Sequence, residues 1–147
     1  MPLPPLPESA ILLRQRVAGW LDAVRLAGAA LVASGATDPG YTKRMIEVID
    51  EFGAYLVIAP GLALAHARPG PDVRRDGLSV VTLATPVRFG HPYNDPVSVV
   101  VGLAVATPDD HVTSVAALAN VFNDHTAISA LAAAESAEEV QRIMASE

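Results

Sequence analysis

The sequence contains no cysteine, so disulfide bonds and thiolate chemistry are excluded. Aromatic residues make up only 5% of the chain, whereas 51% of residues are hydrophobic, so the core must be mainly aliphatic. No stretch approaches the roughly 18 consecutive apolar residues of a membrane span, and the N-terminus lacks the basic and apolar regions of a signal peptide. These absences favour a cytoplasmic protein.

Positive charge is also scarce. The chain has 10 Lys and Arg against 16 Asp and Glu, which gives a net charge of -6. Such a surface disfavours nucleic acid and anionic membranes as partners and suits a basic protein. The 147 residues fit one domain. We expect this domain over residues 10–147, after a proline-rich flexible tail over residues 1–9.

Apolar residues recur at helical spacing in several segments. The expected helices cover residues 19–34, 39–52, 108–122, 125–134 and 137–144. Asp38, Thr107 and Ser136 stand where helix N-caps belong. Phe52 completes the apolar stripe of the second helix, and Val112 belongs to that of the third. Both side chains are therefore expected to face the core.

Strands are expected where short apolar segments interrupt the helical pattern. These segments cover residues 11–13, 55–58, 62–64, 78–83 and 97–105. The last is apolar nearly throughout, which is typical of a strand buried on both faces. Because helices precede and follow the cluster of strands, the sequence predicts a three-layer α/β domain with a mixed, mostly buried sheet.

His66 follows one of these short strands, between Pro60-Gly61 and Pro69-Gly-Pro71. A packed strand presents the side chain at its end rigidly. His111 lies in the first turn of the helix after the central strand. Functional sites of open α/β sheets gather at strand ends beside helix N-termini, so the two histidines could meet there. Arg68 could add positive charge to such a site.

The chemistry open to these residues is limited. The sequence has no Gly-x-Ser-x-Gly nucleophile elbow and no Gly-x-x-x-x-Gly-Lys phosphate loop, and its histidine spacing gives only a weak zinc signal. A histidine that attacks phosphorus needs only a neutral imidazole and donors around the phosphoryl group. The helix N-terminus at residue 108 could supply those donors, although Asp109 and Asp110 oppose its effect on a nearby imidazole.

The segment Pro60-Gly-Leu-Ala-Leu-Ala-His-Ala-Arg68 resembles the phosphorylated-histidine motif of a known family, Pro-Gly-Ile-Ala-Leu-Pro-His-Ala-Arg. The family is that of enzyme IIA domains of the sugar phosphotransferase system, fructose/mannitol superfamily, and the similarity is greatest to its ascorbate-type branch. Pro86-Val-Arg-Phe-Gly90, Asn94-Asp-Pro-Val97 and His111 also match. The resemblance covers roughly residues 10–146.

The resemblance implies a three-layer α/β/α sandwich with a mixed, mostly parallel five-stranded sheet. It also implies that His66 takes a phosphoryl group from the phosphocarrier protein HPr and passes it to a cysteine of a cognate enzyme IIB, which serves a membrane enzyme IIC permease. His111 would support the phosphorylated histidine. Arg68, Leu64 and Ala65 would contact the partner proteins, with Leu62 completing an aliphatic rim, and no cofactor or metal would be needed.

The sequence departs from the family pattern at Ala65, where the family usually has proline, and this change could loosen the backbone before His66. Two alternatives stay open. The domain could be a regulatory module whose phosphorylation signals to a protein partner, or His66 and His111 could form a metal-assisted hydrolase. His91 and His125 receive no role. An alanine-rich helical surface could support a homodimer, and the transported sugar is not readable from the chain.

Overall fold

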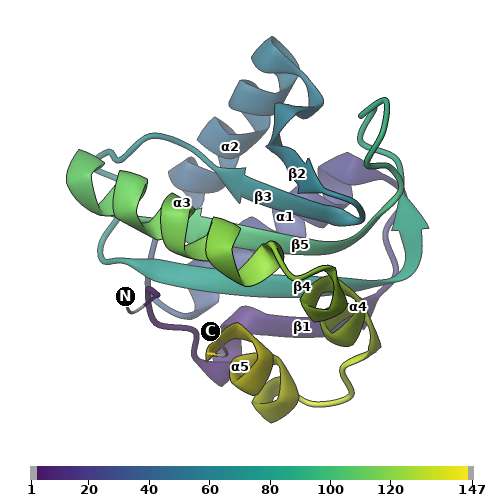
Figure 1. Ribbon diagram of the computed structural model, residues 1–147. Coiled ribbons are helices and arrows are strands. Elements are labelled where there is room, and N and C mark those ends of the chain that lie inside the picture. The colour runs from purple at the N-terminus through teal and green to yellow at the C-terminus, as the bar shows by residue number, and fades with distance from the viewer. Residues whose placement is uncertain (1–2, 146–147) are drawn as a thin grey trace.

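The computed structural model describes residues 3–145 and contains one five-stranded sheet with helices on both faces (Figure 1). The strands are β1 (Ile11–Gln15), β2 (Val57–Ala59), β3 (Leu62–His66), β4 (Gly77–Val87) and β5 (Val97–Ala104). The helices are α1 (Trp20–Ala33), α2 (Pro39–Phe52), α3 (Pro108–Phe122), α4 (His125–Ala133) and α5 (Ala137–Ala145). Two short 3-10 turns are η1 (Glu8–Ala10) and η2 (Ala54–Leu56). No helix within residues 3–145 is long and apolar enough to cross a bilayer.

The sheet has the order β1-β4-β5-β3-β2. Strands β1 and β3 run parallel to β4 and β5 respectively, whereas the β4–β5 and β2–β3 pairs are antiparallel. The sheet is mixed, as expected, but the expectation that it is mostly parallel was wrong. The physical reason is that the turn between β2 and β3 and the loop between β4 and β5 contain no crossover helix, which parallel neighbours need.

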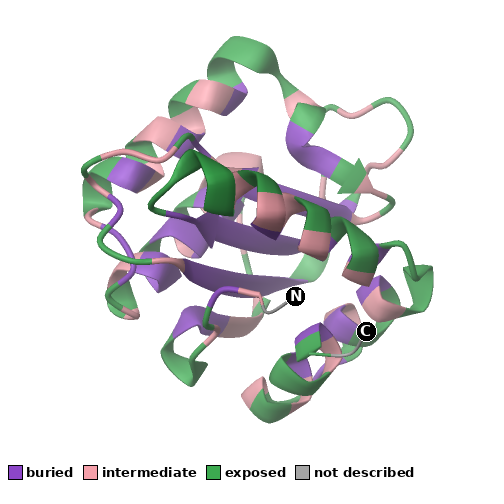
Figure 2. Ribbon diagram, turned by 60° about the vertical axis from the view of Figure 1, so that its left-hand side comes forward, coloured by how far each residue is buried: buried purple, intermediate pink, exposed green. Residues whose placement is uncertain are grey.

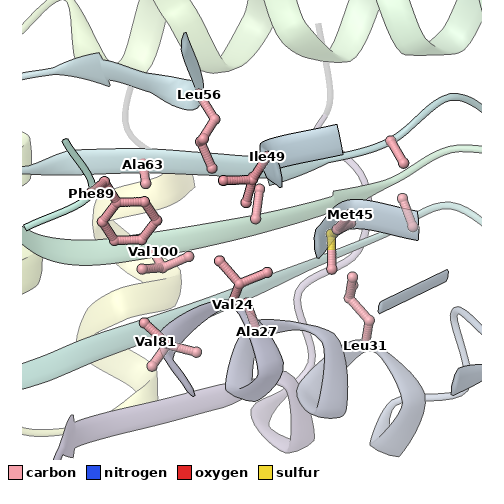
Figure 3. Close-up of a cluster of buried hydrophobic side chains, with 14 of the residues drawn as sticks. Val24, Ala27, Leu31, Met45, Ile49, Leu56, Ala63, Val81, Phe89 and Val100 are labelled. Atoms are coloured by element: carbon pink, nitrogen blue, oxygen red, sulfur yellow. The ribbon is translucent and has the colours of Figure 1, made fainter. Parts of the chain in front are cut away.

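Helices α1 and α2 cover one face of the sheet, and α3, α4 and α5 cover the other, so the expected three layers are present (Figure 1). Each face has its own aliphatic core. Figure 3 shows the first, in which Val24 and Leu31 of α1 and Met45 and Ile49 of α2 pack against the sheet. The central β5 is buried along nearly its whole length, as its apolar sequence predicts, and the middle of the sheet is accordingly purple in Figure 2.

The helix caps are mostly those that the sequence indicates. Thr107 accepts a hydrogen bond from the backbone of Asp110, and Ser136 accepts one from Glu139. Asp38 occupies the N-cap position of α2 as expected, but its side chain makes no capping bond and instead accepts a hydrogen bond from Arg74. The strand expected at 55–58 begins only at Val57, since η2 precedes it.

The N-terminal segment differs from the expected flexible tail. Pro4 is buried, the Pro5 carbonyl accepts a hydrogen bond from the backbone N–H of Leu78, and the Leu6 carbonyl accepts one from Gln141 of α5. Residues 3–7 therefore lie against the core beside α5, because leucines alternate with the prolines and the extended backbone finds donors. Residues 1 and 2 lie outside the described part of the chain.

Candidate functional site

His66 is the last residue of β3, and it emerges from a strand that is otherwise buried. Residues 62–65 are all buried, whereas His66 is half-buried, so the strand fixes the backbone and releases the side chain at its end. At the start of the strand Gly61 has a φ of +82°, which only glycine adopts readily, and this allows the tight turn from β2. The structure thus places His66 as the sequence predicts.

One nitrogen of the His66 ring is held by the backbone. Its Nδ1 lies 2.8 Å from the carbonyl oxygen of Leu64. A carbonyl can only accept, so Nδ1 carries the proton and Nε2 of the neutral ring has the free electron pair. Burial lowers the pKa of His66 from its ordinary value, although the hydrogen bond to Leu64 acts in the opposite direction. Burial prevails, so the ring is mainly neutral at pH 7 and Nε2 keeps its free electron pair.

His111 lies beside His66, as the topology suggested. The two ring centroids are 5.4 Å apart and the planes are inclined by 44°. Burial lowers the pKa of His111, and the nearby His66 adds to the effect, because two imidazolium ions would repel one another. Nδ1 of His111 is buried and has no hydrogen-bond partner among residues 3–145.

Arg68 and the two apolar residues that were expected to contact partners differ in their exposure. Arg68 is exposed, and its side chain forms no hydrogen bond or ion pair within residues 3–145, so it is free to reach an incoming anion. Leu64 and Ala65 were wrong as contact residues, as was Leu62 in the same rim. Their exposed fractions are 1%, 0% and 0%, because both faces of β3 are covered by helices.

Exposed apolar side chains around the two histidines come instead from Tyr55, which was expected in a strand, and from Phe52 and Val112, which were expected to face the core. Tyr55 packs its ring edge-on against His66 with centroids 6.0 Å apart, and Phe52 packs edge-on against Tyr55. Val112 follows His111 on α3. Phe52, Tyr55 and Val112, here called the apolar collar, are 66%, 48% and 70% exposed. For Phe52 and Val112 the signal in the sequence was a position near the end of a helix, where a periodic stripe can pass beyond the core.

The other histidines do not join this site. His91 lies in the loop between β4 and β5, which bonds through Asn94 to Gly61 at the opposite end of β3. His125 is exposed at the start of α4. Within residues 3–145, no group of three or more His, Asp or Glu side chains lies close enough to hold a metal ion. The hydrolase alternative therefore finds no third ligand beside His66 and His111 in the part of the chain that the structure describes.

Comparisons with known proteins show the family and the fold of the chain. The family model described as "Phosphoenolpyruvate-dependent sugar phosphotransferase system, EIIA 2" matches residues 5–147. A protein of Salmonella choleraesuis named "Ascorbate-specific PTS system EIIA component" is 35% identical over 134 residues, which cover 90% of this chain and 87% of that protein.

Two solved structures from Escherichia coli have the same fold. One is a complex of enzyme IIA Mtl with phosphorylated enzyme IIB Mtl, with a TM-score of 0.84, 26% identity and coverage of 96% of this chain and 97% of that one. The other is IIA mannitol, with a TM-score of 0.81, 27% identity and coverage of 93% and 96%. The chain belongs to the EIIA type 2 family of the phosphoenolpyruvate-dependent sugar phosphotransferase system, whose members carry phosphoryl groups on histidine.

Proposed function

We propose that His66 is the phosphorylated residue of this EIIA protein, and that its Nε2 accepts a phosphoryl group from phospho-HPr and delivers it to a cysteine of a cognate enzyme IIB. The observation that carries the proposal is the bond between Nδ1 of His66 and the Leu64 carbonyl. It leaves the free electron pair on Nε2, at the end of a rigid strand and beside a second histidine.

Both transfers balance without a cofactor. In the first, the Nε2 electron pair attacks phosphorus, and the bond between phosphorus and the donor's imidazole breaks with its electrons left on that nitrogen. Nδ1 of His66 keeps its proton throughout and donates to Leu64 while the ring carries the added charge. In the second, a thiolate attacks phosphorus in line and Nε2 recovers its electron pair.

His111 and Arg68 are the candidates to stabilise the phosphoryl group. Nδ1 of His111 is enclosed by protein, so Nε2 is the nitrogen available to the phosphoryl oxygens. Arg68 is two residues from His66 and unpaired within residues 3–145, and its guanidinium can approach a dianion that arrives with a partner. The N-terminus of α3 adds a favourable dipole at the same end of the sheet.

The apolar collar replaces Leu62, Leu64 and Ala65 as the proposed docking surface. Tyr55 contacts the His66 ring, Phe52 contacts Tyr55, and Val112 follows His111 in the chain; exposed apolar side chains at such positions are typical of a protein contact. Exposed acids flank the collar at Glu51, Asp109 and Asp110, and the whole chain has a net charge of -6. This charge favours a partner with a basic face, and we assign the surface to HPr and, in the next step, to enzyme IIB.

The substrate assignment rests on similarity. The relative from Salmonella choleraesuis is named ascorbate-specific at 35% identity, so we propose an ascorbate-type system with a membrane enzyme IIC as the final component. The phosphoryl donors of such a system are cytoplasmic, and the same compartment is proposed for this protein. A homodimer stays a prediction, which sedimentation of the purified protein would test.

Intact-protein mass spectrometry at alkaline pH tests the proposed function, because phosphohistidine survives there. The protein is incubated with phosphoenolpyruvate, enzyme I and HPr, in parallel with His66→Ala and with His125→Ala as a matched histidine control. We expect one phosphoryl group on wild type and on His125→Ala and none on His66→Ala. A folded wild type that stays unmodified beside phosphorylated HPr would contradict the proposal.

A further inference from the structure

The hydroxyl group of Tyr41 is buried beside the backbone that follows His66. Tyr41 belongs to α2 and is 1% exposed. Its hydroxyl lies 2.6 Å from the Leu103 carbonyl oxygen, and it accepts a hydrogen bond of 3.0 Å from the Ala67 N–H. Burial raises the pKa of Tyr41 to about 12, so the hydroxyl stays protonated and able to donate to a carbonyl.

These bonds lie at the point where the β3–β5 ladder ends. The last paired residues in the register of the two strands are His66 and Leu103. Beyond this pair the Ala67 N–H has no strand partner, and a buried N–H without a partner is costly. The Tyr41 hydroxyl takes the place of the missing ladder bond and joins the two strands one residue past His66.

Tyr41 is itself held in place from the same loop. The guanidinium of Arg44, one turn later on α2, lies 5.2 Å from the centre of the Tyr41 ring. Arg44 also forms a two-pronged ion pair with Asp72, with nitrogen–oxygen distances of 2.8 and 2.6 Å. Gly70 leaves the necessary space, because a Cβ there would come within 2.7 Å of Arg44. The loop after His66 is thus attached to α2 at Ala67 and at Asp72.

We infer that Tyr41 is a positioning residue for His66. Its hydroxyl joins Ala67 to Leu103 and so fixes the backbone at the end of β3. This fixed backbone keeps the His66 ring in the orientation in which Nδ1 bonds to the Leu64 carbonyl. The inference rests on the proposed function, because it explains how the reactive ring is kept in one orientation. The restraint matters more in this chain, since Ala65 leaves the backbone before His66 without the rigidity of a proline.

Tyr41→Phe removes only the hydroxyl and is the variant that tests the inference. Two readouts are needed: the rate of phosphoryl transfer from phospho-HPr, and the imidazole nitrogen and Nδ1–H resonances of His66 in ¹⁵N-labelled protein without any partner. We expect the transfer rate to fall roughly 10- to 100-fold, as for a small misplacement of a reacting group. We also expect the Nδ1–H resonance of His66 to exchange with water faster than in wild type.

Two controls separate positioning from loss of stability. Tyr93→Phe makes the same change on a side chain that is 87% exposed. Val140→Ala weakens the core on the other face of the sheet, at a residue that is 0% exposed and far along the chain from His66. Neither should change the His66 resonances or the transfer rate. Asp72→Asn serves as a second test variant should Tyr41→Phe fail to fold, and it should change both readouts in the same direction and by less.

A folded Tyr41→Phe with wild-type transfer rate and unchanged His66 resonances would overturn the inference. So would a Val140→Ala protein that changes both readouts as much as Tyr41→Phe does. Failure of the proposed function has a different signature, since wild type would then take up no phosphoryl group. The His66 resonances of the unphosphorylated variants would still decide the role of Tyr41.

Discussion

Two histidines lie toward opposite ends of β3 and bond to the backbone in opposite senses. At the carboxyl end, Nδ1 of His66 donates to the Leu64 carbonyl. In the loop near the amino end, Nδ1 of His91 accepts from the backbone N–H groups of Tyr93 and Asn94 at 3.1 and 3.0 Å. Neutral His66 therefore has its free electron pair on Nε2, whereas neutral His91 has a proton there.

The difference teaches that the backbone partner of Nδ1 determines which ring nitrogen of each neutral histidine keeps a free electron pair. The loop that contains His91 is bonded to the turn between β2 and β3. Its Asn94 side chain donates to the Val57 carbonyl, and its Asn94 carbonyl accepts from Gly61, so it clamps the turn that leads into β3. The loop holds the amino end of β3, and the carboxyl end presents His66, the proposed site of phosphorylation.

The largest expected effect comes from the same substitution at both histidines. His66→Asn should abolish phosphoryl uptake, because no nucleophilic nitrogen remains. His91→Asn should keep full uptake, since an asparagine oxygen can accept the two backbone N–H groups in place of Nδ1. Intact mass after exposure to phospho-HPr measures both. Uptake by His66→Asn, or its loss in folded His91→Asn, would break the comparison.

A second contrast concerns two exposed tyrosines. Tyr55→Ala should raise the KM for phospho-HPr roughly tenfold with little change in kcat, because Tyr55 belongs to the apolar collar beside His66. Tyr93→Ala, in the loop of His91, should leave both constants unchanged although Tyr93 is 87% exposed. Steady-state transfer measured against HPr concentration separates the two. Equal effects of both substitutions would show that the collar is not the docking surface.

A smaller effect is expected on the free energy of unfolding when the loop between β4 and β5 is changed at Asp95. The Asp95 carboxylate accepts hydrogen bonds from the N–H groups of Phe89, Gly90 and His91. Burial acts to raise the pKa of Asp95, but these bonds and the charge of Arg88 outweigh it, so the pKa lies below its ordinary value. Asp95→Asn should lower the free energy of unfolding by about 1 kcal/mol and leave the transfer rate unchanged.

The difference in the free energy of unfolding between wild type and Asp95→Asn should depend on pH. The folded state binds the Asp95 proton less tightly than the unfolded chain does, so the stabilisation is present above the ordinary pKa of 3.8 and is lost as the pH falls below it. Urea unfolding of wild type and Asp95→Asn at pH 7 and at pH 3 measures this. A stability difference that grows at low pH would contradict the role assigned to the carboxylate.

The smallest effect is expected on the pH profile of transfer. Because burial lowers the pKa of His66 below 6.5, more than half of the His66 rings are neutral at pH 6.5, and the transfer rate should change less than about twofold between pH 8 and 6.5. The rate should fall only at lower pH, where the folded state is also destabilised because the unfolded chain binds the proton more tightly. The rate is measured with excess phospho-HPr. A transfer rate that falls to half its maximum already above pH 6.5 would contradict the lowered pKa of His66.

Local patterns predicted most of the fold and the position of His66, because periodicity, caps and turn residues act over a few neighbouring residues. They failed where tertiary contacts decide. Leu64 and Ala65 are buried because helices cover both faces of β3, and Phe52 and Val112 are exposed because their helices extend past the sheet. Tyr41 lies on the buried side of α2 together with Met45 and Ile49, yet its hydroxyl bonds to residues 26 and 62 positions away in the sequence, which no local pattern reveals.

The most direct test of the account identifies the nitrogen that carries the phosphoryl group. The protein with ¹⁵N-labelled histidines is phosphorylated by phospho-HPr, and the nitrogen coupled to ³¹P is assigned by NMR. We predict one coupling, at Nε2 of His66, with Nδ1 still protonated and the resonances of His91 unchanged. Coupling at Nδ1 of His66, or at any other histidine, would contradict the account.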